Sequence, residues 1–150
     1  MDEKTKKALS ALQALCSKQE CCSHDIYSKA LKRLEGDEEA AAEIMAELVR
    51  EKYVDDSRYA ASFAREKSSI AGWGPVKIRH ALSAKGIARS VADDALREID
   101  PERSEARMEK LLTAKWRLLK EDPQGRLKLI RYALSRGYEY SQIENLLRNL

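Results

Sequence analysis

Residues 71–87 read AGWGPVKIRHALSAKGI and contain signals for both the start and the end of one helix. Gly72 and Gly74 interrupt the helical pattern that precedes them. Pro75 suits the first turn of a new helix because its missing N–H would have no helical partner there. Gly86 at the other end is typical of a helix that stops at a left-handed residue. The stretch therefore predicts a short helix that begins at Pro75.

Similar signals on both sides of this stretch predict about nine short helices and no strands. Aromatic residues make up 6% of the chain and there are three prolines, which favours helices over sheet. A third helix is expected over about 37–52. Polar residues and prolines mark the expected helix starts: Ser23 for the second helix, Asp55 or Asp56 for the fourth, Asp100-Pro101 and Asp122-Pro123 for later ones, and Ser141 with Glu144 as a capping box for the last.

The helix pattern repeats along the chain with a shift of 51 residues. The shift places Gly86 on Gly137, so that the helix stops agree, and it aligns apolar positions in both directions. We predict an all-α protein of three tandem three-helix repeats of about 50 residues, with boundaries 1–54, 55–100 and 101–150. Each repeat is small for an independent core, so an elongated, curved array is expected.

Composition indicates a folded protein without membrane segments or a metal centre. Hydrophobic residues make up 43% and charged residues 35% of the 150 residues. The N-terminus carries acids and no continuous apolar stretch, so a cytoplasmic location is the default. Cys16, Cys21 and Cys22 with His24 form C-x4-C-C-x-H, which lacks the paired C-x2-C spacing of zinc sites. We expect reduced thiols that pack in a turn, and neither a metal nor a cofactor.

Positive charge increases toward the C-terminus. The three predicted repeats hold 9, 8 and 11 basic and 11, 7 and 7 acidic residues, which gives −2, +1 and +4. There is no acid between Glu66 and Asp93 or between Asp122 and Glu139, and these two windows are repeat equivalents. A basic surface of this kind suits an acidic protein groove or a phosphate backbone.

The shift of 51 residues also aligns basic residues, carrying Lys77 to Lys128, His80 to Arg131 and Lys85 to Arg136. Core positions must match in a repeat, whereas solvated charges need not, so the match favours a shared function. The predicted partner-binding or DNA-binding residues are Lys77, Arg79, His80, Lys85, Arg89, Lys128, Arg131 and Arg136.

The sequence predicts no enzyme. It contains no G-x-x-x-x-G-K-[ST], G-x-S-x-G or H-E-x-x-H, and its two histidines offer no plausible triad, so no catalytic residue is assigned. Trp73 has two interpretations, a buried wedge that locks the turn or an aromatic platform beside Lys77 on which a base could stack. We prefer the wedge, because flanking glycines allow close packing. His80 is expected at the surface.

The stretch from Val54 to Ile99 resembles the central repeat of the RecX regulatory proteins. The family pattern has an acidic pair before an aromatic-alanine helix start, a glycine-proline helix start, and a Lys-Gly flanked by apolar residues. The matching positions are Asp55, Asp56, Arg58, Tyr59, Ala60, Phe63, Gly74, Pro75, Ile78, Leu82, Lys85, Gly86 and Ile87. Asp55, Asp56, Tyr59, Trp73, Gly74, Pro75 and Gly86 are predicted to form the structural framework. Departures are Glu35 where Gly86 aligns and Ala133 where Leu82 aligns.

The resemblance implies a non-catalytic regulator of the RecA recombinase. Such a protein would act as a monomer in the groove of the RecA filament on single-stranded DNA. It would restrain ATPase, strand-exchange and co-protease activities in recombination, DNA repair and the SOS response. Two alternatives stay open: a direct DNA- or RNA-binding protein that needs no recombinase, and a helical-repeat scaffold for an unrelated protein.

Overall fold

The computed structural model describes all residues, 1–150, and contains nine α-helices and no strand. The predicted all-α repeat fold is confirmed. The helices are α1 (Glu3–Lys18), α2 (Ser23–Arg33), α3 (Glu38–Arg50), α4 (Asp56–Ser69), α5 (Pro75–Ala84), α6 (Arg89–Arg97), α7 (Pro101–Leu119), α8 (Gly125–Ser135) and α9 (Tyr140–Leu147).

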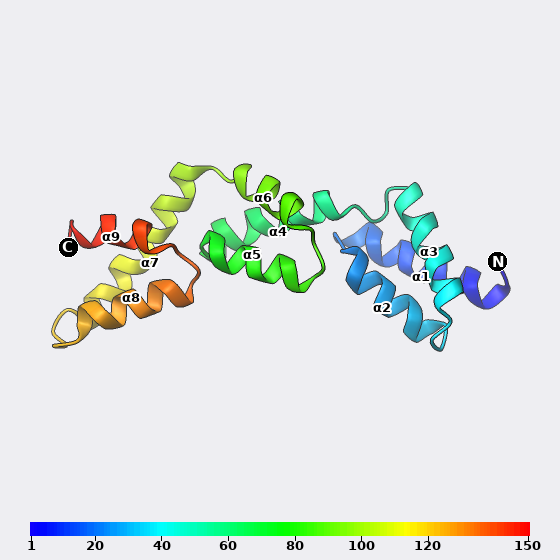
Figure 1. Ribbon diagram of the computed structural model, residues 1–150, viewed down its shortest axis with the longest axis horizontal. Helices are drawn as coiled ribbons and strands as arrows, with labels where there is room; N and C mark the ends of the chain where they lie inside the picture. The colour runs from blue at the N-terminus through cyan, green and yellow to red at the C-terminus, as the bar shows by residue number, and fades with distance from the viewer.

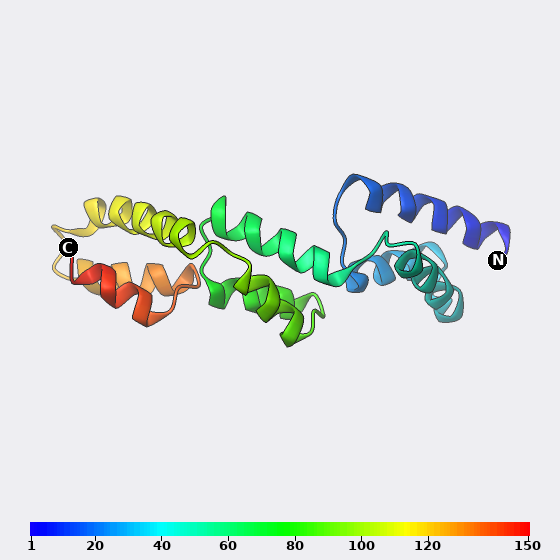
Figure 2. The ribbon, with the colours of Figure 1, turned by 90° about the horizontal axis from the view of Figure 1, so that it is seen from above.

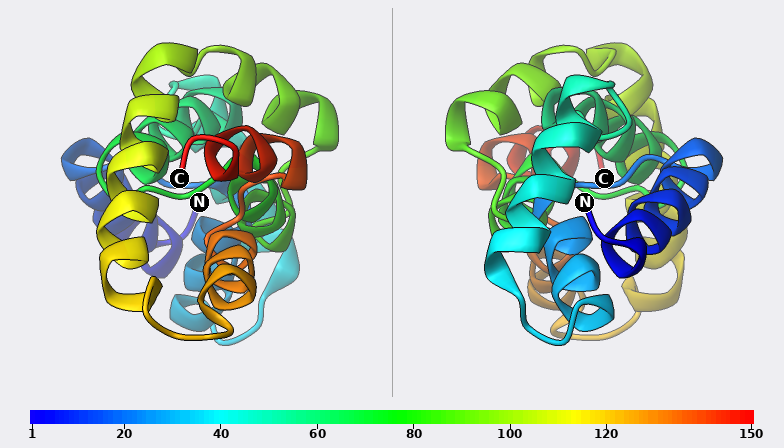
Figure 3. Two further views of the ribbon diagram at one scale, coloured as in Figure 1. Left: turned by 90° about the vertical axis from the view of Figure 1, so that its left-hand side faces the viewer. Right: turned by 90° about the vertical axis from the view of Figure 1, so that its right-hand side faces the viewer.

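Three units follow one another along an elongated molecule, with the termini at opposite ends (Figure 1). We name them unit one (α1–α3), unit two (α4–α6) and unit three (α7–α9). The first helices of the units, α1, α4 and α7, follow one another along one side (Figure 2). Seen along the long axis, the helices surround the point where both termini project (Figure 3). No helix is both long and apolar enough to span a bilayer.

Each unit has its own hydrophobic cluster. Unit one buries Leu12, Ile26, Ile44 and their neighbours, and unit three buries a comparable set around Leu112. Cys22 is the exception, because it precedes α2 yet packs in the cluster of unit two. The clusters fit the predicted repeats, whose boundaries stay a prediction. The three cysteines are buried and free, as expected, and burial raises the pKa of the Cys16 thiol to about 12.

Several helix starts differ from the predictions. Cys22, not Ser23, is the N-cap of α2, and the N–H of Ser23 donates instead to the distant Asp56 carboxylate at 2.8 Å. α8 begins at Gly125, two residues after Pro123, because the Asp122 carboxylate accepts from the N–H of Gln124 and closes a turn first. The last helix has its capping box at Glu139 and Gln142 instead of Ser141 and Glu144. The third helix is shorter than predicted and covers Glu38–Arg50.

Other predicted signals are found where expected. Asp55 caps α4 through the N–H of Arg58 at 3.0 Å, and Pro75 is the first residue of α5. Gly86 and Gly137 both have positive φ, 73° and 92°. Glu35, which aligns with Gly86, also takes a left-handed conformation with φ 54°. The helix stop of unit one therefore keeps a left-handed residue at the position of Gly86 although that residue is not glycine, and the left-handed Gly36 follows it.

Gly86→Ala is expected to lower the free energy of unfolding by about 1 kcal/mol, since an L side chain is strained at positive φ. An added Cβ would lie 3.6 Å from the Cβ of His24, an ordinary contact, so strain of the backbone is the only cost. Urea denaturation followed by circular dichroism measures the change. An unchanged stability would mean that this turn relaxes easily to negative φ.

Candidate functional site

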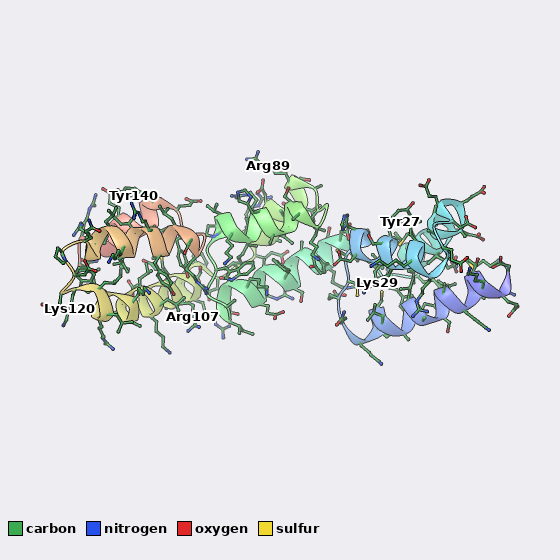
Figure 4. All side chains as sticks on the ribbon, turned by 90° about the horizontal axis from the view of Figure 1, so that it is seen from below. Tyr27, Lys29, Arg89, Arg107, Lys120 and Tyr140 are labelled. Carbon is green, nitrogen blue, oxygen red and sulfur yellow. The ribbon has the colours of Figure 1, made fainter.

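The middle helices of the three units lie end to end in one row, which we call the α8–α5–α2 row (Figures 1 and 4). All three helices point the same way, toward the N-terminal end of the molecule. The C-terminal end of α8 meets the start of α5, and the end of α5 meets the start of α2. Repeat-equivalent residues of α5 and α8 therefore recur along one line.

Two hydrogen bonds between backbone groups join α8 to α5. The N–H of Gly74 donates to the carbonyl of Arg136 at 2.8 Å, and the N–H of Val76 donates to the carbonyl of Gly137 at 3.0 Å. The first N–H groups and last carbonyls of a helix have no partner within that helix. Here the carbonyls at the end of α8 accept hydrogen bonds from the N–H groups at the start of α5, so both sets of groups gain a partner. Head-to-tail alignment of the helix dipoles is also favourable.

Glycine is required on both sides of this contact. A Cβ on Gly74 would lie 2.3 Å from the carbonyl oxygen of Gly137, and a Cβ on Gly137 would lie 2.3 Å from the Cβ of Lys77. Side chains at either position would separate the two helices. Gly74, the second glycine of the GWGP sequence, is thus explained by contact between units rather than by the turn alone.

The loop before α5 is also bound to unit three. The carbonyl of Ile70 accepts from Arg107 at 3.1 Å, that of Ala71 accepts from Arg136, and that of Gly72 accepts from the Tyr138 hydroxyl at 2.6 Å. Burial raises the pKa of Tyr138, so its hydroxyl stays a neutral donor. With the backbone hydrogen bonds, these contacts fix the position of unit three relative to unit two.

Side chains make the joint between units one and two. Asp56 accepts from the N–H of Ser23, and Lys85 at the end of α5 pairs with Asp25 in the first turn of α2 at 2.8 Å. The hydrogen bond from Lys85 lowers the pKa of Asp25 and raises the pKa of Lys85. Arg58 pairs with Glu20. Asp56 and Arg58 of the family pattern thus reach across to unit one.

The structure brings three predicted residues together on unit two. Arg79, His80 and Arg89 line one hollow of about 300 Å³. Asp93 pairs with Arg79 at 3.2 Å and more loosely with Arg89 at 4.0 Å. His80 is exposed, as expected, and the Arg89 side chain is 86% exposed and projects from the molecule in Figure 4.

The predicted residues of unit three separate into two groups. Lys128 and Arg131 are exposed on α8, and Lys128 pairs with Asp122 at 2.6 Å whereas Arg131 has no ion pair. Arg136 is half-buried at the joint, where its guanidinium binds a carbonyl of unit two. Lys85 is engaged at the other joint by the carboxylate of Asp25. Both therefore have a role within the fold, and their contact with a partner stays a prediction.

Trp73 is half-buried and packs against the cluster of unit two, which agrees in part with the interpretation of this residue as a buried wedge. Its ring meets Phe63 edge-on at 6.1 Å between centroids, and Phe63 stacks on Tyr59 at 5.8 Å. The ammonium groups of Lys67 and Lys77 lie 4.9 and 4.4 Å from the ring centroid of Trp73, and neither lysine has a carboxylate partner. Two cations close to one ring form a favourable place for an anion.

Sequence reasoning missed Val76 and Leu127, which are exposed apolar residues with 37% and 44% of their surface accessible. They are equivalent under the same shift of 51 residues that aligns Lys77 with Lys128. The same shift would have identified this pair, but the apolar residues that it aligns were interpreted only as core positions. Units two and three therefore both contain an exposed apolar residue, a lysine directly after it, and a histidine or arginine three positions after the lysine.

The chain matches two family descriptions: RecX, second three-helix domain, over residues 55–96, and RecX, third three-helix domain, over residues 102–147. The Regulatory protein RecX of Salmonella arizonae is 35% identical over 97 residues, which cover 65% of this chain and 58% of the relative. That of Oceanobacillus iheyensis is 31% identical over 125 residues, covering 82% and 46%. This chain thus spans about half the length of these relatives.

Two solved structures share the fold. A crystal structure of regulatory protein RecX has a TM-score of 0.86 and 30% identity, covering 97% of this chain and 72% of that one. The crystal structure of RecX from Lactobacillus salivarius has a TM-score of 0.87 and 23% identity, covering 100% and 98%. At that lower identity, the second structure shows the fold alone.

Proposed function

The chain belongs to the RecX family of regulatory proteins, and from this premise we propose that it regulates a RecA-type recombinase by binding along the recombinase filament. It acts as a monomer in the cytoplasm, where the filament assembles on single-stranded DNA. The α8–α5–α2 row is the binding surface, and no residue performs catalysis.

The repetition of one surface pattern along the row supports this proposal most directly. Val76, Lys77 and His80 on α5 recur as Leu127, Lys128 and Arg131 on α8. A partner that repeats along an axis, as a filament does, offers equivalent sites to successive units of such a row. A globular partner without repeats would have no reason to match the pattern twice.

We propose that the regulation is inhibition, exerted by binding across neighbouring recombinase subunits. The joint between units two and three is fixed by hydrogen bonds, so a molecule bound to two subunits holds their spacing. Since a ligand stabilises the state it binds, it opposes rearrangements that accompany ATP hydrolysis and strand exchange. We expect the co-protease activity of the filament to fall as well.

Addition of the protein to RecA filaments on single-stranded DNA tests the proposal. ATP hydrolysis is expected to fall as the protein is added, and the protein should sediment with the filaments. The hydrolysis rate without added protein serves as the reference. An unchanged rate together with no association to the filament would exclude this function.

Direct binding to nucleic acid is a second candidate, favoured by the lysines beside Trp73 and by the charge of +4 in residues 101–150. In that case affinity for DNA without recombinase should decrease with salt, with a log-log slope of about −0.7 per neutralised phosphate of a single strand. Binding that appears only when recombinase coats the DNA favours the first function instead.

A further inference from the structure

A groove of about 390 Å³ lies between units two and three. It differs from the α8–α5–α2 row in charge, because none of its lining residues is basic although the chain has 28 lysines and arginines. Its lining comes from the ends of α4 and α6, the starts of α5 and α7, and α9 (Figure 1). The fixed joint between the two units keeps the groove formed.

The apolar part of the groove comes mainly from residues of the two neighbouring cores. Trp73 and Ile78 of unit two and Met108 and Leu146 of unit three all line it. Ile78, Met108 and Leu146 are buried, so they contribute a firm base rather than a mobile surface. This part of the groove suits an aliphatic chain.

The polar part of the groove is acidic and rich in acceptors. Glu105 and Glu109 are exposed one turn apart on α7, and neither has an ion pair. Like charges at this spacing repel each other, so a cation between them is favoured. Three carboxamide side chains line the groove as well, from α9 and from the residue just beyond its C-cap: Gln142, Asn145 and Asn149.

We propose that this groove receives an arginine side chain from a protein partner. The volume is near the lower end for ligand pockets, roughly 300–1000 Å³, and suits a side chain with its immediate neighbours rather than a large cofactor. A guanidinium offers five N–H donors in a plane, which can serve two carboxylates and nearby amide oxygens at once. The proposal concerns a separate surface and stands whichever partner the row binds.

The surroundings also set the orientation of the arginine. Lys67 and Lys77 hold their ammonium groups within 5 Å of the Trp73 ring, at 4.9 and 4.4 Å, so a third cation is disfavoured there. The guanidinium therefore lies at Glu105 and Glu109, and the aliphatic stem lies on the apolar base. Binding should change the surroundings of the Trp73 ring, which makes that ring a reporter.

The experiment uses Trp116→Phe protein, in which Trp73 is the only tryptophan. The probes are a blocked peptide Ala-Leu-Arg-Leu-Ala and the same peptide with neutral, isosteric citrulline in place of arginine. The arginine peptide should change Trp73 fluorescence saturably at up to millimolar concentration and bind at least about tenfold more tightly than the citrulline peptide, as expected for charge-assisted hydrogen bonds. No saturable response, or equal affinity for both peptides, would overturn the proposal.

Glu105→Gln with Glu109→Gln should remove the preference for arginine and leave the affinity for the citrulline peptide unchanged. The matched control is Glu43→Gln with Glu66→Gln, which changes the net charge equally at exposed carboxylates outside the groove. This control should keep the preference. Loss of the preference in the control as well would show that overall charge, not the groove, selects arginine.

Discussion

Gly137→Ala is expected to lower the free energy of unfolding by about 3 kcal/mol. Two costs combine at this position. Its φ is 92°, which costs a side chain about 1–2 kcal/mol, and an added Cβ would lie 2.3 Å from the Cβ and 2.6 Å from the backbone nitrogen of Lys77. Overpacking of this kind typically costs about 1–3 kcal/mol. Urea denaturation followed by circular dichroism measures the total.

Two further glycines separate these costs. Gly36 has φ 87° and no atom within 4 Å of an added Cβ, so Gly36→Ala isolates backbone strain and should cost about 1 kcal/mol. Gly74 has an ordinary φ of −82° but the same contact, so Gly74→Ala isolates the clash and should cost about 2 kcal/mol.

The double variant Gly74→Ala with Gly137→Ala tests whether one contact is involved. Once the first alanine has separated the helices, the second adds little more than its strain, so the two effects should be less than additive. Equal effects of Gly36→Ala and Gly137→Ala would contradict the close contact between α5 and α8.

Local signals explain why so much of the fold could be predicted. Pro75, Gly86 and the Asp55 cap act on their own helix, so their residue types carry the information within a few positions. The cap of α2 shows the limit. The carboxylate of Asp56, 33 residues away in the sequence, accepts the hydrogen bond from the N–H of Ser23 in the first turn of α2. The sequence had instead indicated the Ser23 side chain as the cap. A sequence pattern read locally contains nothing that would choose the distant carboxylate.

The candidate site was predicted in outline for the same reason. Periodicity identified the aligned basic residues Lys77 and Lys128, but contacts between units determine which cations are free. Lys85 meets Asp25 across one joint, and Arg136 meets a backbone carbonyl across the other. These pairings depend on how units pack, which a repeat interval does not specify. Arg131, by contrast, has no ion pair and stays available to a partner.

Lys77→Glu with Arg131→Glu is expected to weaken binding to the recombinase filament by about 100-fold. Each substitution reverses one cation of the α8–α5–α2 row, and neither side chain has a carboxylate partner within the chain. Loss of one favourable charge and gain of a repulsive one costs about tenfold in affinity per position, or 1.4 kcal/mol. Lys128 is left unchanged, because reversing it would place two carboxylates together at Asp122.

Co-sedimentation with RecA filaments at several salt concentrations measures the loss. The defect should shrink as salt increases, since exposed charges are screened beyond about 8 Å at physiological ionic strength. The matched control is Arg65→Glu with Lys110→Glu, which reverses one exposed cation in each of the same two units, on α4 and α7. It changes the net charge equally and should bind nearly as well as the unaltered protein.

The two variants together distinguish a specific surface from general positive charge. If both lose binding to the same extent, the net charge governs association and the row has no special role. If only the row variant loses binding, and does so equally on DNA without recombinase, the row contacts phosphate and the direct nucleic-acid function is favoured. A defect confined to recombinase-coated DNA is the result expected of a filament regulator, because only there does the partner repeat in step with α5 and α8.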